Sequence, residues 1–340
     1  GLWEAMEQLR GQFEQKVGGT RMSRGDVRTA VLALLAEKPM HGYQIIQQIE
    51  ERSGGSWKPS PGSVYPTLQL LADARALIVR NRTQVDEALL EAAPGLKVVG
   101  RLGVGLDNID TTACVARGIE VIPATGANAL AVAEYVIGTA MLLLRGAYQA
   151  TAAVADGRWP RGPLSNGREI AGKVLGVVGF GGIGRLTARL GQALGMRVIG
   201  FDPQLPVASP AWAAHQTAAR ALADVLREAD VVSLHVPLTV GTRGLIDEAR
   251  LASMKPDAIL VNTARGGVVD DAALAAALRA GRLGGAALDV FETEPLPAGS
   301  ALAGCPNLIL TPHVAGVTRE SNARVSTLIA DKVAAALVRS

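Results

Sequence analysis

Apolar positions follow two different rhythms on either side of one short segment, "LQLLADARALIVRNRTQ" (residues 68–84). Before it, apolar residues recur every three to four positions, which is typical of amphipathic helices. After it, apolar runs of four to eight residues alternate with helical stretches, which favours a mostly parallel α/β sheet. Because no Gly or Pro separates the two rhythms, the chain reads as two unlike parts joined inside the segment.

The first part of the chain carries helical patterns only. Helices are predicted at 2–16, 25–36, 43–51 and 64–73. Pro66 is expected in the first turn of the last of these helices, where a missing N–H is harmless, with Ser63 as its cap. Short helices with tight turns predict a helix-turn-helix unit.

The second part of the chain alternates strand and helix patterns. A long helix is predicted at 128–145, and a strand is expected just before His313. The other strands are predicted at 77–80, 96–100, 119–124, 173–180, 196–202, 230–236, 258–264 and 284–290.

Composition limits the class of protein. The 340 residues are 49% hydrophobic and 19% charged, with only 4% aromatic residues. We find no signal peptide and no apolar run near the ~18 residues that a membrane span needs. Two cysteines fit a reducing compartment better than a disulfide framework or a metal cluster. These features predict a cytoplasmic protein without metal. Gly1 is not an initiator residue, and Met22 is a candidate start. The sequence leaves open whether residues 1–21 are native or an upstream extension.

The net charge of +3 belongs to the first part of the chain. Residues 1–85 hold 11 basic and 8 acidic residues, whereas residues 86–340 hold 23 of each. This excess weakly favours an anionic partner for the first part.

The strongest chemical signal is "KVLGVVGFGGIGRLTARLGQALGMRVIGFDP". A strand leads into Gly179, Gly181 and Gly184, and a helix and a second strand follow. The three glycines suit a tight turn, a close approach to a pyrophosphate and helix packing on the strand. Asp202 lies 18 residues beyond Gly184, where a carboxylate accepts from both ribose hydroxyls and repels a 2′-phosphate. The pattern predicts a dinucleotide site that prefers NAD over NADP.

Three later residues each follow a predicted strand: Arg265, Glu294 and His313. Ligands of open α/β sheets bind at these strand ends, so we expect the three side chains to converge. An arginine binds a carboxylate and polarises a ketone, a histidine protonates the forming alkoxide, and a carboxylate orients that histidine. Alone, each residue is open to a structural reading, as an ion pair, a loop acid or a core histidine. Together they favour hydride transfer to a 2-oxo acid.

Two segments closely resemble the winged-helix domain of the PadR family of transcriptional regulators: "VLALLAEKPMHGYQI" and "WKPSPGSVYPTLQLL". The resemblance implies an all-α DNA-binding module with a two-stranded wing. It implies DNA contacts at Lys58, Ser60, Ser63 and Tyr65. The alternative is that the two serines are caps and the tyrosine is a core residue. No returning wing strand is predicted after residue 80, so the regulator pattern stops at the join.

From about residue 76 onward, the chain closely resembles the NAD-dependent D-2-hydroxyacid dehydrogenase family, with a phosphoglycerate dehydrogenase-like pattern. The resemblance implies Arg265, Glu294 and His313 as the catalytic set. It implies that Asp289 lies near the carboxamide of the cofactor. The cofactor contacts, derived or implied, are Gly179, Gly181, Gly182, Ile183, Gly184, Asp202, Thr263, Ala264 and Asp289. The implied substrate contacts are Arg80, Arg101, Gly103, Val104 and Gly105, the two arginines for a distal anionic group.

These parts predict an α/β fold with three domains. Residues 1–76 form the winged-helix-like module, and residues 77–127 with 311–340 form a truncated flavodoxin-like substrate domain. Residues 128–310 form a Rossmann-like doubly wound parallel sheet. The opening strands of the substrate domain are missing, so the strand at 77–80 is expected to be an open edge that favours self-association.

The function predicted is NAD-dependent interconversion of a 2-hydroxy acid and a 2-oxo acid, by a homodimer or a higher assembly. Two alternatives stay open. One is a DNA-binding regulator whose dehydrogenase-like half senses NAD(H). The other is a chimera with impaired activity, since both halves are incomplete.

Overall fold

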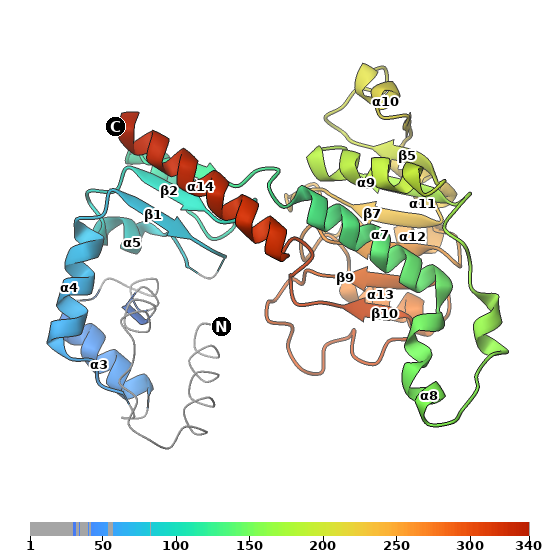
Figure 1. Cartoon of the computed structure of the whole chain (residues 1–340), viewed down its shortest axis with the longest axis horizontal. Coiled ribbons are helices and arrows are strands. Elements are labelled where there is room, and N and C mark those ends of the chain that lie inside the picture. The colour runs from blue at the N-terminus through green and yellow to red at the C-terminus, as the bar shows by residue number, and fades with distance from the viewer. Residues whose placement is uncertain are drawn as a thin grey trace. The chain divides into compact units, whose positions relative to one another are not determined.

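The computed structural model describes residues 30–31, 34, 40, 42–53, 57–81 and 83–339. The chain divides into two compact units, residues 1–128 with 322–340, and residues 129–321. Each unit contains one parallel sheet (Figure 1). The helices predicted at 2–16 and 25–36 lie outside the described residues, except for residues 30, 31 and 34, which are helical. The division into three domains stays a prediction.

The first unit is built on a three-stranded parallel sheet of order β1-β2-β3. Its elements are α3 (Gly42–Arg52), α4 (Pro61–Ala72), β1 (Ala76–Val79), α5 (Glu87–Ala92), β2 (Val98–Arg101), α6 (Thr111–Ala116), β3 (Glu120–Pro123) and α14 (Arg319–Arg339). The three strands confirm the prediction of a reduced sheet at these positions.

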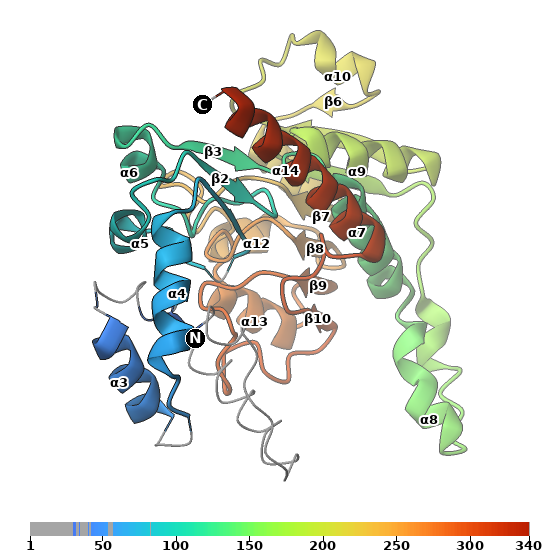
Figure 2. The ribbon, with the colours of Figure 1, turned by 60° about the vertical axis from the view of Figure 1, so that its left-hand side comes forward.

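Two cores cover the two faces of this sheet. One face packs on α14 through Ile329 and Val333, and a side chain at Gly100 of β2 would collide with both. Figures 1 and 2 show α14 lying across the strands. The other face shares one core with α3, α4 and α5, in which Ile45 of α3 and Leu89 of α5 are completely buried. The described helices α3 and α4 therefore pack directly on one face of the small sheet.

Strand β1 lies at one edge of the sheet, because it pairs only with β2 within the described residues. Its Ile78 side chain is 47% exposed. After β1 the chain enters α5, and the part of the chain that the structure describes contains no antiparallel partner for β1. Among the residues that the structure describes, this arrangement agrees with the predicted open edge and incomplete wing.

Helix α4 corrects one prediction. It begins at Pro61 rather than at residue 64, and Ser60 rather than Ser63 precedes its first turn. The physical reason is that Pro61 already supplies the favoured backbone angle and needs no N–H partner at that position. The Ser63 hydroxyl instead donates to the Ser60 carbonyl, at 2.8 Å, inside the first turn.

The second unit is built on a seven-stranded parallel sheet of order β10-β9-β8-β7-β4-β5-β6. The short strand β6 is an element that the sequence patterns did not predict. The elements are α7 (Ala129–Arg145), η1 (Ala147–Ala150), α8 (Thr151–Ala155), η2 (Pro163–Asn166), β4 (Val174–Val178), α9 (Gly182–Ala193), β5 (Arg197–Phe201), α10 (Pro210–Ala214), β6 (Ala218–Ala219), α11 (Leu222–Glu228), β7 (Val231–Leu234), α12 (Glu248–Ser253), β8 (Ile259–Asn262), α13 (Asp271–Arg279), β9 (Gly285–Leu288) and β10 (Leu308–Leu310).

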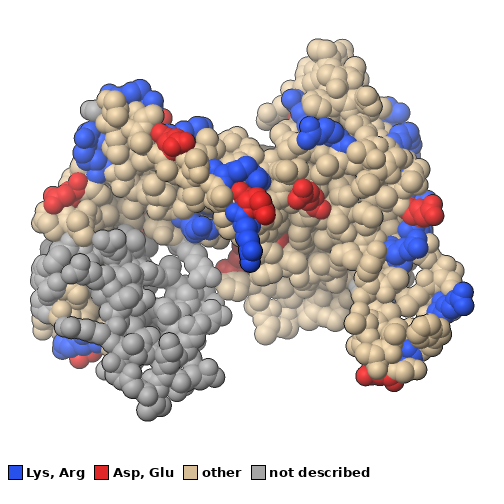
Figure 3. Space-filling view, viewed as in Figure 1, with Lys and Arg blue, Asp and Glu red and all other residues tan. Residues whose placement is uncertain are grey.

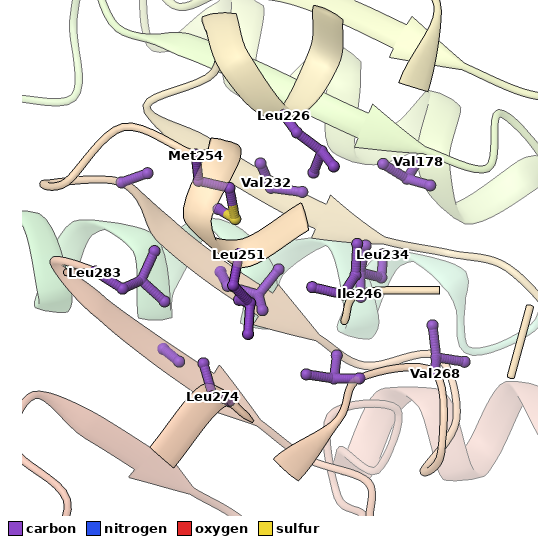
Figure 4. Close-up of a cluster of buried hydrophobic side chains, with 14 of the residues drawn as sticks. Val178, Leu226, Val232, Leu234, Ile246, Leu251, Met254, Val268, Leu274 and Leu283 are labelled. Atoms are coloured by element: carbon purple, nitrogen blue, oxygen red, sulfur yellow. The ribbon is translucent and has the colours of Figure 1, made fainter. Parts of the chain in front are cut away.

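Helices cover both faces of the seven-stranded sheet. On one face α11, α12 and α13 contribute Leu226, Leu251 and Leu274 to the core drawn in Figure 4. On the other face α7 contributes Val136 and α9 contributes Ala188 to a second core. Central strands buried on both faces explain the continuous apolar runs in the sequence.

No helix in the described part of the chain is long and apolar enough to cross a membrane. On the face drawn in Figure 3, basic and acidic side chains are interspersed rather than gathered by sign.

Candidate active site

A glycine turn connects β4 to α9 in the second unit. Gly179 has φ +95°, a left-handed conformation, and a Cβ there would lie 2.6 Å from the carbonyl oxygen of His235. A Cβ on Gly184 would collide with the carbonyl oxygen of Gly179, so α9 packs directly against the turn. Only glycine meets both demands, as the motif predicts.

The amino end of α9 opens onto free space. A Cβ on Gly181 or on Gly182 would meet nothing within 4 Å, and no side chain caps this helix end. The N–H groups of the first helical turn carry partial positive charge and need an acceptor. This arrangement fits the pyrophosphate of a dinucleotide.

Asp202 follows β5 and is held against the glycine turn. One carboxylate oxygen accepts from the N–H of Phe180 at 2.8 Å, and the other accepts from the N–H of Gln204 at 2.9 Å. Each oxygen keeps a lone pair for a ribose hydroxyl. The residues present therefore fit a dinucleotide without a 2′-phosphate.

The remaining predicted cofactor residues of this group lie at the same end of the sheet. Ile183 belongs to the first turn of α9, and Thr263 and Ala264 directly follow β8. The Thr263 hydroxyl is buried and has no hydrogen-bond partner among the described residues. Their roles stay predictions.

The loop after β8 places Arg265 beside the loop after β9. A side chain at Gly266 would collide with the backbone of Phe291 and Glu292, so the two loops touch backbone to backbone. The Asn262 amide donates to the Arg265 carbonyl at 3.0 Å and fixes the turn. Because of this close approach, the Arg265 charge acts on Glu294.

His313 and Glu294 form a hydrogen-bonded ion pair. The Nδ1 of His313 lies 2.8 Å from one carboxylate oxygen of Glu294, and the other oxygen accepts from the N–H of Phe291 at 3.1 Å. With Nδ1 donating to Glu294, the Nε2 of the protonated ring carries a transferable proton. The structure thus brings together the three residues predicted to converge.

The ion pair moves the two pKa values apart. The hydrogen bond to Glu294 raises the pKa of His313, outweighing burial, and the charges of Glu294 and Asp289 raise it further while Arg265 opposes them. Burial alone would raise the pKa of Glu294. Hydrogen bonds from His313 and the Phe291 N–H, with the charges of His313 and Arg265, hold the pKa of Glu294 below its usual value. The imidazole therefore stays protonated over a wider pH range.

Asp289 is 1% exposed, and its carboxylate faces the loop that carries His313. It accepts from the hydroxyl of Thr311 and from the N–H groups of Val314 and Ala315. Its contact with a carboxamide stays a prediction. His235 follows β7, its Nε2 lies 2.9 Å from the Ser233 hydroxyl, and burial lowers the pKa of His235 to about 4.

In the first unit, Arg101 ends β2 and is buried. Its Nε donates to the side-chain oxygen of Asn108 at 3.2 Å. The Asn108 amide nitrogen donates to the carbonyls of Arg80, at 2.9 Å, and Thr83, at 2.5 Å. One asparagine therefore connects the carboxyl ends of β1 and β2, where both predicted substrate arginines lie.

The loop from Gly103 to Gly105, whose residues are implied substrate contacts, follows closely after Arg101. A side chain at Gly103 would collide with the Arg101 guanidinium. Among the described residues, no hydrogen-bond acceptor meets the N–H groups of Val104 and Gly105. Two such N–H groups suit an anion.

Three of the predicted DNA contacts form hydrogen bonds or an ion pair with residues of the same module. Lys58 pairs with Glu50 at 2.7 Å, and the hydroxyls of Ser60 and Ser63 lie 3.3 Å apart. The hydrogen bond and charge of Glu50 raise the pKa of Lys58. Tyr65 belongs to α4, and its side chain lies outside the described atoms.

Sequence reasoning missed Asn108 as a polar residue of this region. The signal that was present is the "GLDNID" stretch, in which an amide follows a glycine-rich turn at the end of a strand. It does not say which backbone carbonyls that amide reaches.

Comparisons with known proteins agree with the two-part reading. Residues 137–315 match the family model "D-isomer specific 2-hydroxyacid dehydrogenase, NAD binding domain". Residues 31–88 match the model "Transcriptional regulator PadR-like family", which therefore extends past β1 and into α5. The two matches confirm both resemblances.

Among relatives, the chain is 57% identical over 266 residues to (S)-sulfolactate dehydrogenase of Chromohalobacter salexigens, covering 78% of this chain and 85% of that protein. It is 43% identical over 271 residues to D-3-phosphoglycerate dehydrogenase of Mycobacterium tuberculosis, covering 79% of this chain and 50% of that protein. The chain thus spans about half the length of that phosphoglycerate dehydrogenase.

Among solved structures, D-lactate dehydrogenase of Aquifex aeolicus, complexed with NAD and lactic acid, is similar with a TM-score of 0.70 and 32% identity, covering 80% of this chain and 85% of that chain. The TT0316 protein of Thermus thermophilus is similar with a TM-score of 0.71 and 36% identity, over 83% and 88% of the two chains. With its glycine turn, Asp202 and the His313–Glu294 pair, this chain belongs to the D-isomer specific 2-hydroxyacid dehydrogenase family and contains that family's NAD-binding domain.

Proposed function

We propose that this chain interconverts a 2-hydroxy acid and a 2-oxo acid that carry a second strong anion, such as a sulfonate or a phosphate. The observation that carries the proposal is the buried Arg101, held by Asn108 beside the chain segment of Arg80. Two guanidiniums suit a second anion better than they suit a methyl group. The similarity to a sulfolactate dehydrogenase supports the same substrate class.

We assign the chemical roles as follows. The glycine turn and Asp202 would hold NADH, which would supply a hydride for the carbonyl carbon of the substrate. Arg265 binds the 2-oxo acid and polarises its carbonyl oxygen. His313 donates the proton on Nε2 to the forming alkoxide, and Glu294 stabilises the imidazolium through Nδ1. In the direction of oxidation, the neutral imidazole accepts the hydroxyl proton instead.

The N–H groups of Val104 and Gly105 are assigned to the carboxylate of the substrate. Their lack of acceptors among the described residues supports this role. A carboxylate that accepts from backbone N–H groups is held without the entropy cost of fixing a long side chain.

A panel of 2-oxo acids tests the proposal. NADH oxidation is measured with pyruvate, with sulfopyruvate and with phosphohydroxypyruvate. We expect kcat/KM at least roughly tenfold higher for one of the two compounds that carry a second anionic group, on the scale of one charged hydrogen bond. Equal values for all three would reject the second anion, and no turnover with any of them would reject the activity.

The match of residues 31–88 to the PadR-like model favours a second candidate, DNA binding through α4. Two observations weigh against it. Lys58 is paired with Glu50, and β1 pairs with β2 in a parallel sheet rather than in a wing hairpin. Affinity for duplex DNA that falls steeply with salt would favour this candidate, whereas no binding at low salt would remove it.

A further inference from the structure

The loop that carries His313 needs support from outside itself. His313 has φ +55°, a left-handed conformation that residues other than glycine adopt rarely. Such a conformation persists only when the surroundings hold it. Here the support is the buried carboxylate of Asp289, which accepts from Thr311 Oγ1 at 2.6 Å and from the N–H groups of Val314 and Ala315 at 2.8 Å each.

A tyrosine on another element extends this support. The hydroxyl of Tyr135, on α7, lies 2.7 Å from Thr311 Oγ1. An ionised Asp289 can only accept, so the Thr311 hydrogen goes to Asp289 and Tyr135 must donate to Thr311. The hydrogen bonds therefore run in one direction, from Tyr135 through Thr311 to Asp289.

Helix α7 is a firm base for this chain of hydrogen bonds. Val136, Ala140 and Leu144 of α7 are buried in the core beneath the seven-stranded sheet. Tyr135 itself is half-buried. A donor on a packed helix fixes the rotamer of Thr311 more firmly than water does, because it has few other positions to occupy.

We propose that Tyr135 is a positioning residue for His313. The Tyr135 hydroxyl orients the Thr311 side chain. Thr311 and two backbone N–H groups donate to Asp289, and these hydrogen bonds fix the loop that positions the His313 imidazole. The inference rests on the proposed function in so far as His313 is the acid that protonates the substrate.

The charged groups that act on His313 define what a misplaced loop changes. Glu294 and Asp289 face it with negative charge, and Arg265 faces it with positive charge. If the loop shifts away from Asp289 and Glu294, the pKa of His313 falls. Reduction needs the protonated ring, so its rate would then decline at a lower pH than in the unchanged protein.

Two variants remove the chain of hydrogen bonds from opposite ends: Tyr135→Phe and Thr311→Val. Thr139→Val is the matched control, because Thr139 is a buried hydroxyl of α7 that bonds only to the carbonyls of Tyr135 and Val136 in its own helix. Thr311→Ser keeps a hydroxyl and tests rescue. Each variant is measured for kcat, KM, NADH affinity, melting temperature and the pKa of His313 by NMR titration of the imidazole.

We expect Tyr135→Phe to lower kcat roughly 3- to 10-fold, the scale of one neutral hydrogen bond, and to lower the pKa of His313. NADH affinity should stay within about twofold, since Tyr135 and Thr311 are not predicted cofactor contacts and Asp289 keeps its two backbone N–H partners. Thr311→Val should act in the same direction, and Thr311→Ser should restore both readouts. Thr139→Val should leave the pKa of His313 unchanged.

The inference would be overturned if Tyr135→Phe had the same kcat and the same His313 pKa as the control variant Thr139→Val. If Tyr135→Phe unfolds, the pair Thr311→Val and Thr311→Ser still compares the protein without and with a hydroxyl at position 311. The NMR titration separates the two hypotheses. A protein that reduces no 2-oxo acid rejects the proposed function, while a His313 pKa that responds to Tyr135→Phe but not to Thr139→Val still supports the positioning role.

Discussion

The two sheets of this protein are built from equally short parallel strands, yet they differ in burial. In the seven-stranded sheet, β4, β7, β8 and β9 are buried at every position. In the three-stranded sheet only β2 is buried at every position, and β1 exposes Ile78. A strand with neighbours on both sides and helices on both faces loses all contact with water, whereas an edge strand does not. Position in the sheet sets the difference, because the edge strands β6 and β10 of the larger sheet are also partly exposed.

The same contrast extends to the candidate site residues. His313, Glu294 and Arg265 lie on loops that several backbone and side-chain contacts hold in place. Arg101 and the Arg80 segment are linked by the side chain of Asn108. We therefore expect substitutions far from the site to change kcat, which depends on the loops of the seven-stranded sheet, less than they change the substrate preference, which depends on the two arginines of the three-stranded sheet.

Hydrogen exchange should show the largest difference between the two sheets. The amides of Val174 to Val178 should exchange roughly 10³-fold more slowly than those of Leu77 to Val79, because edge strands open by local unfolding. The measurement is native-state exchange by mass spectrometry. Similar protection at both places, in a protein that is monomeric at micromolar concentration, would show that another segment completes the small sheet.

Replacement of His313 tests the large sheet's chemistry directly. His313→Ala should lower kcat by roughly 10² or more, the scale of a lost general acid. NADH affinity should change little, since the glycine turn is untouched. Asp156→Ala, at an exposed ion pair of the same unit, is the control. Normal turnover by His313→Ala would exclude it as the acid.

The ion pair predicts a pH dependence with a definite sign. The fold raises the pKa of His313, so the pair stabilises the protein fully below the imidazole's unfolded pKa, and this contribution is lost as pH rises through the folded value. The fold lowers the pKa of Glu294, so the contribution of Glu294 is present above its unfolded pKa and lost as pH falls through the folded value.

Glu294→Gln removes the charge that sustains the imidazolium. We expect kcat for reduction to fall roughly tenfold at neutral pH, and its decline with rising pH to begin at a lower pH. Rate profiles from pH 5 to 9 measure both. A profile that keeps its position would show that Glu294 does not set the protonation of His313.

Asp202 tests the cofactor preference of the same unit. NADH should bind at least about tenfold more tightly than NADPH, because a 2′-phosphate would face the carboxylate. Asp202→Ala should narrow the ratio, and Asp156→Ala, at an exposed ion pair, should not. Fluorescence titration with both cofactors gives the ratio, and equal affinities in the unchanged protein would contradict the assignment.

Asn108 should give the smallest effect and a selective one. Asn108→Ala removes the acceptor of Arg101 Nε and the donor to two carbonyls, so KM for a 2-oxo acid with a second anionic group should rise roughly fivefold with little change in kcat. KM for pyruvate is the internal control and should stay within about twofold, since pyruvate has no second anion. A parallel rise for both substrates, or a lower melting temperature that accounts for it, would reduce Asn108 to a structural role.

Local sequence patterns determined much of this protein. Apolar runs located the strands of both sheets except β6, and the glycine spacing located the turn before α9. Glycines, strand runs and the acid after β5 are readable because each acts through neighbours that are close in the chain. The start of α4 was misplaced because Pro66 and Pro61 both satisfy the rule for a first turn, and only the backbone shows which one begins the helix.

Contacts between distant segments were decided by the tertiary structure alone. Asn108 reaches carbonyls 25 and 28 residues away, and Tyr135 reaches a hydroxyl 176 residues away. The family resemblance implies that Asp289 lies near the cofactor, which stays a prediction, and the tertiary structure adds that its carboxylate accepts from the His313 loop. A pattern along the chain records which residues prefer burial or a turn. It carries no record of which polar groups meet across a sheet, because that depends on strand order and on the packing of helices far apart in sequence.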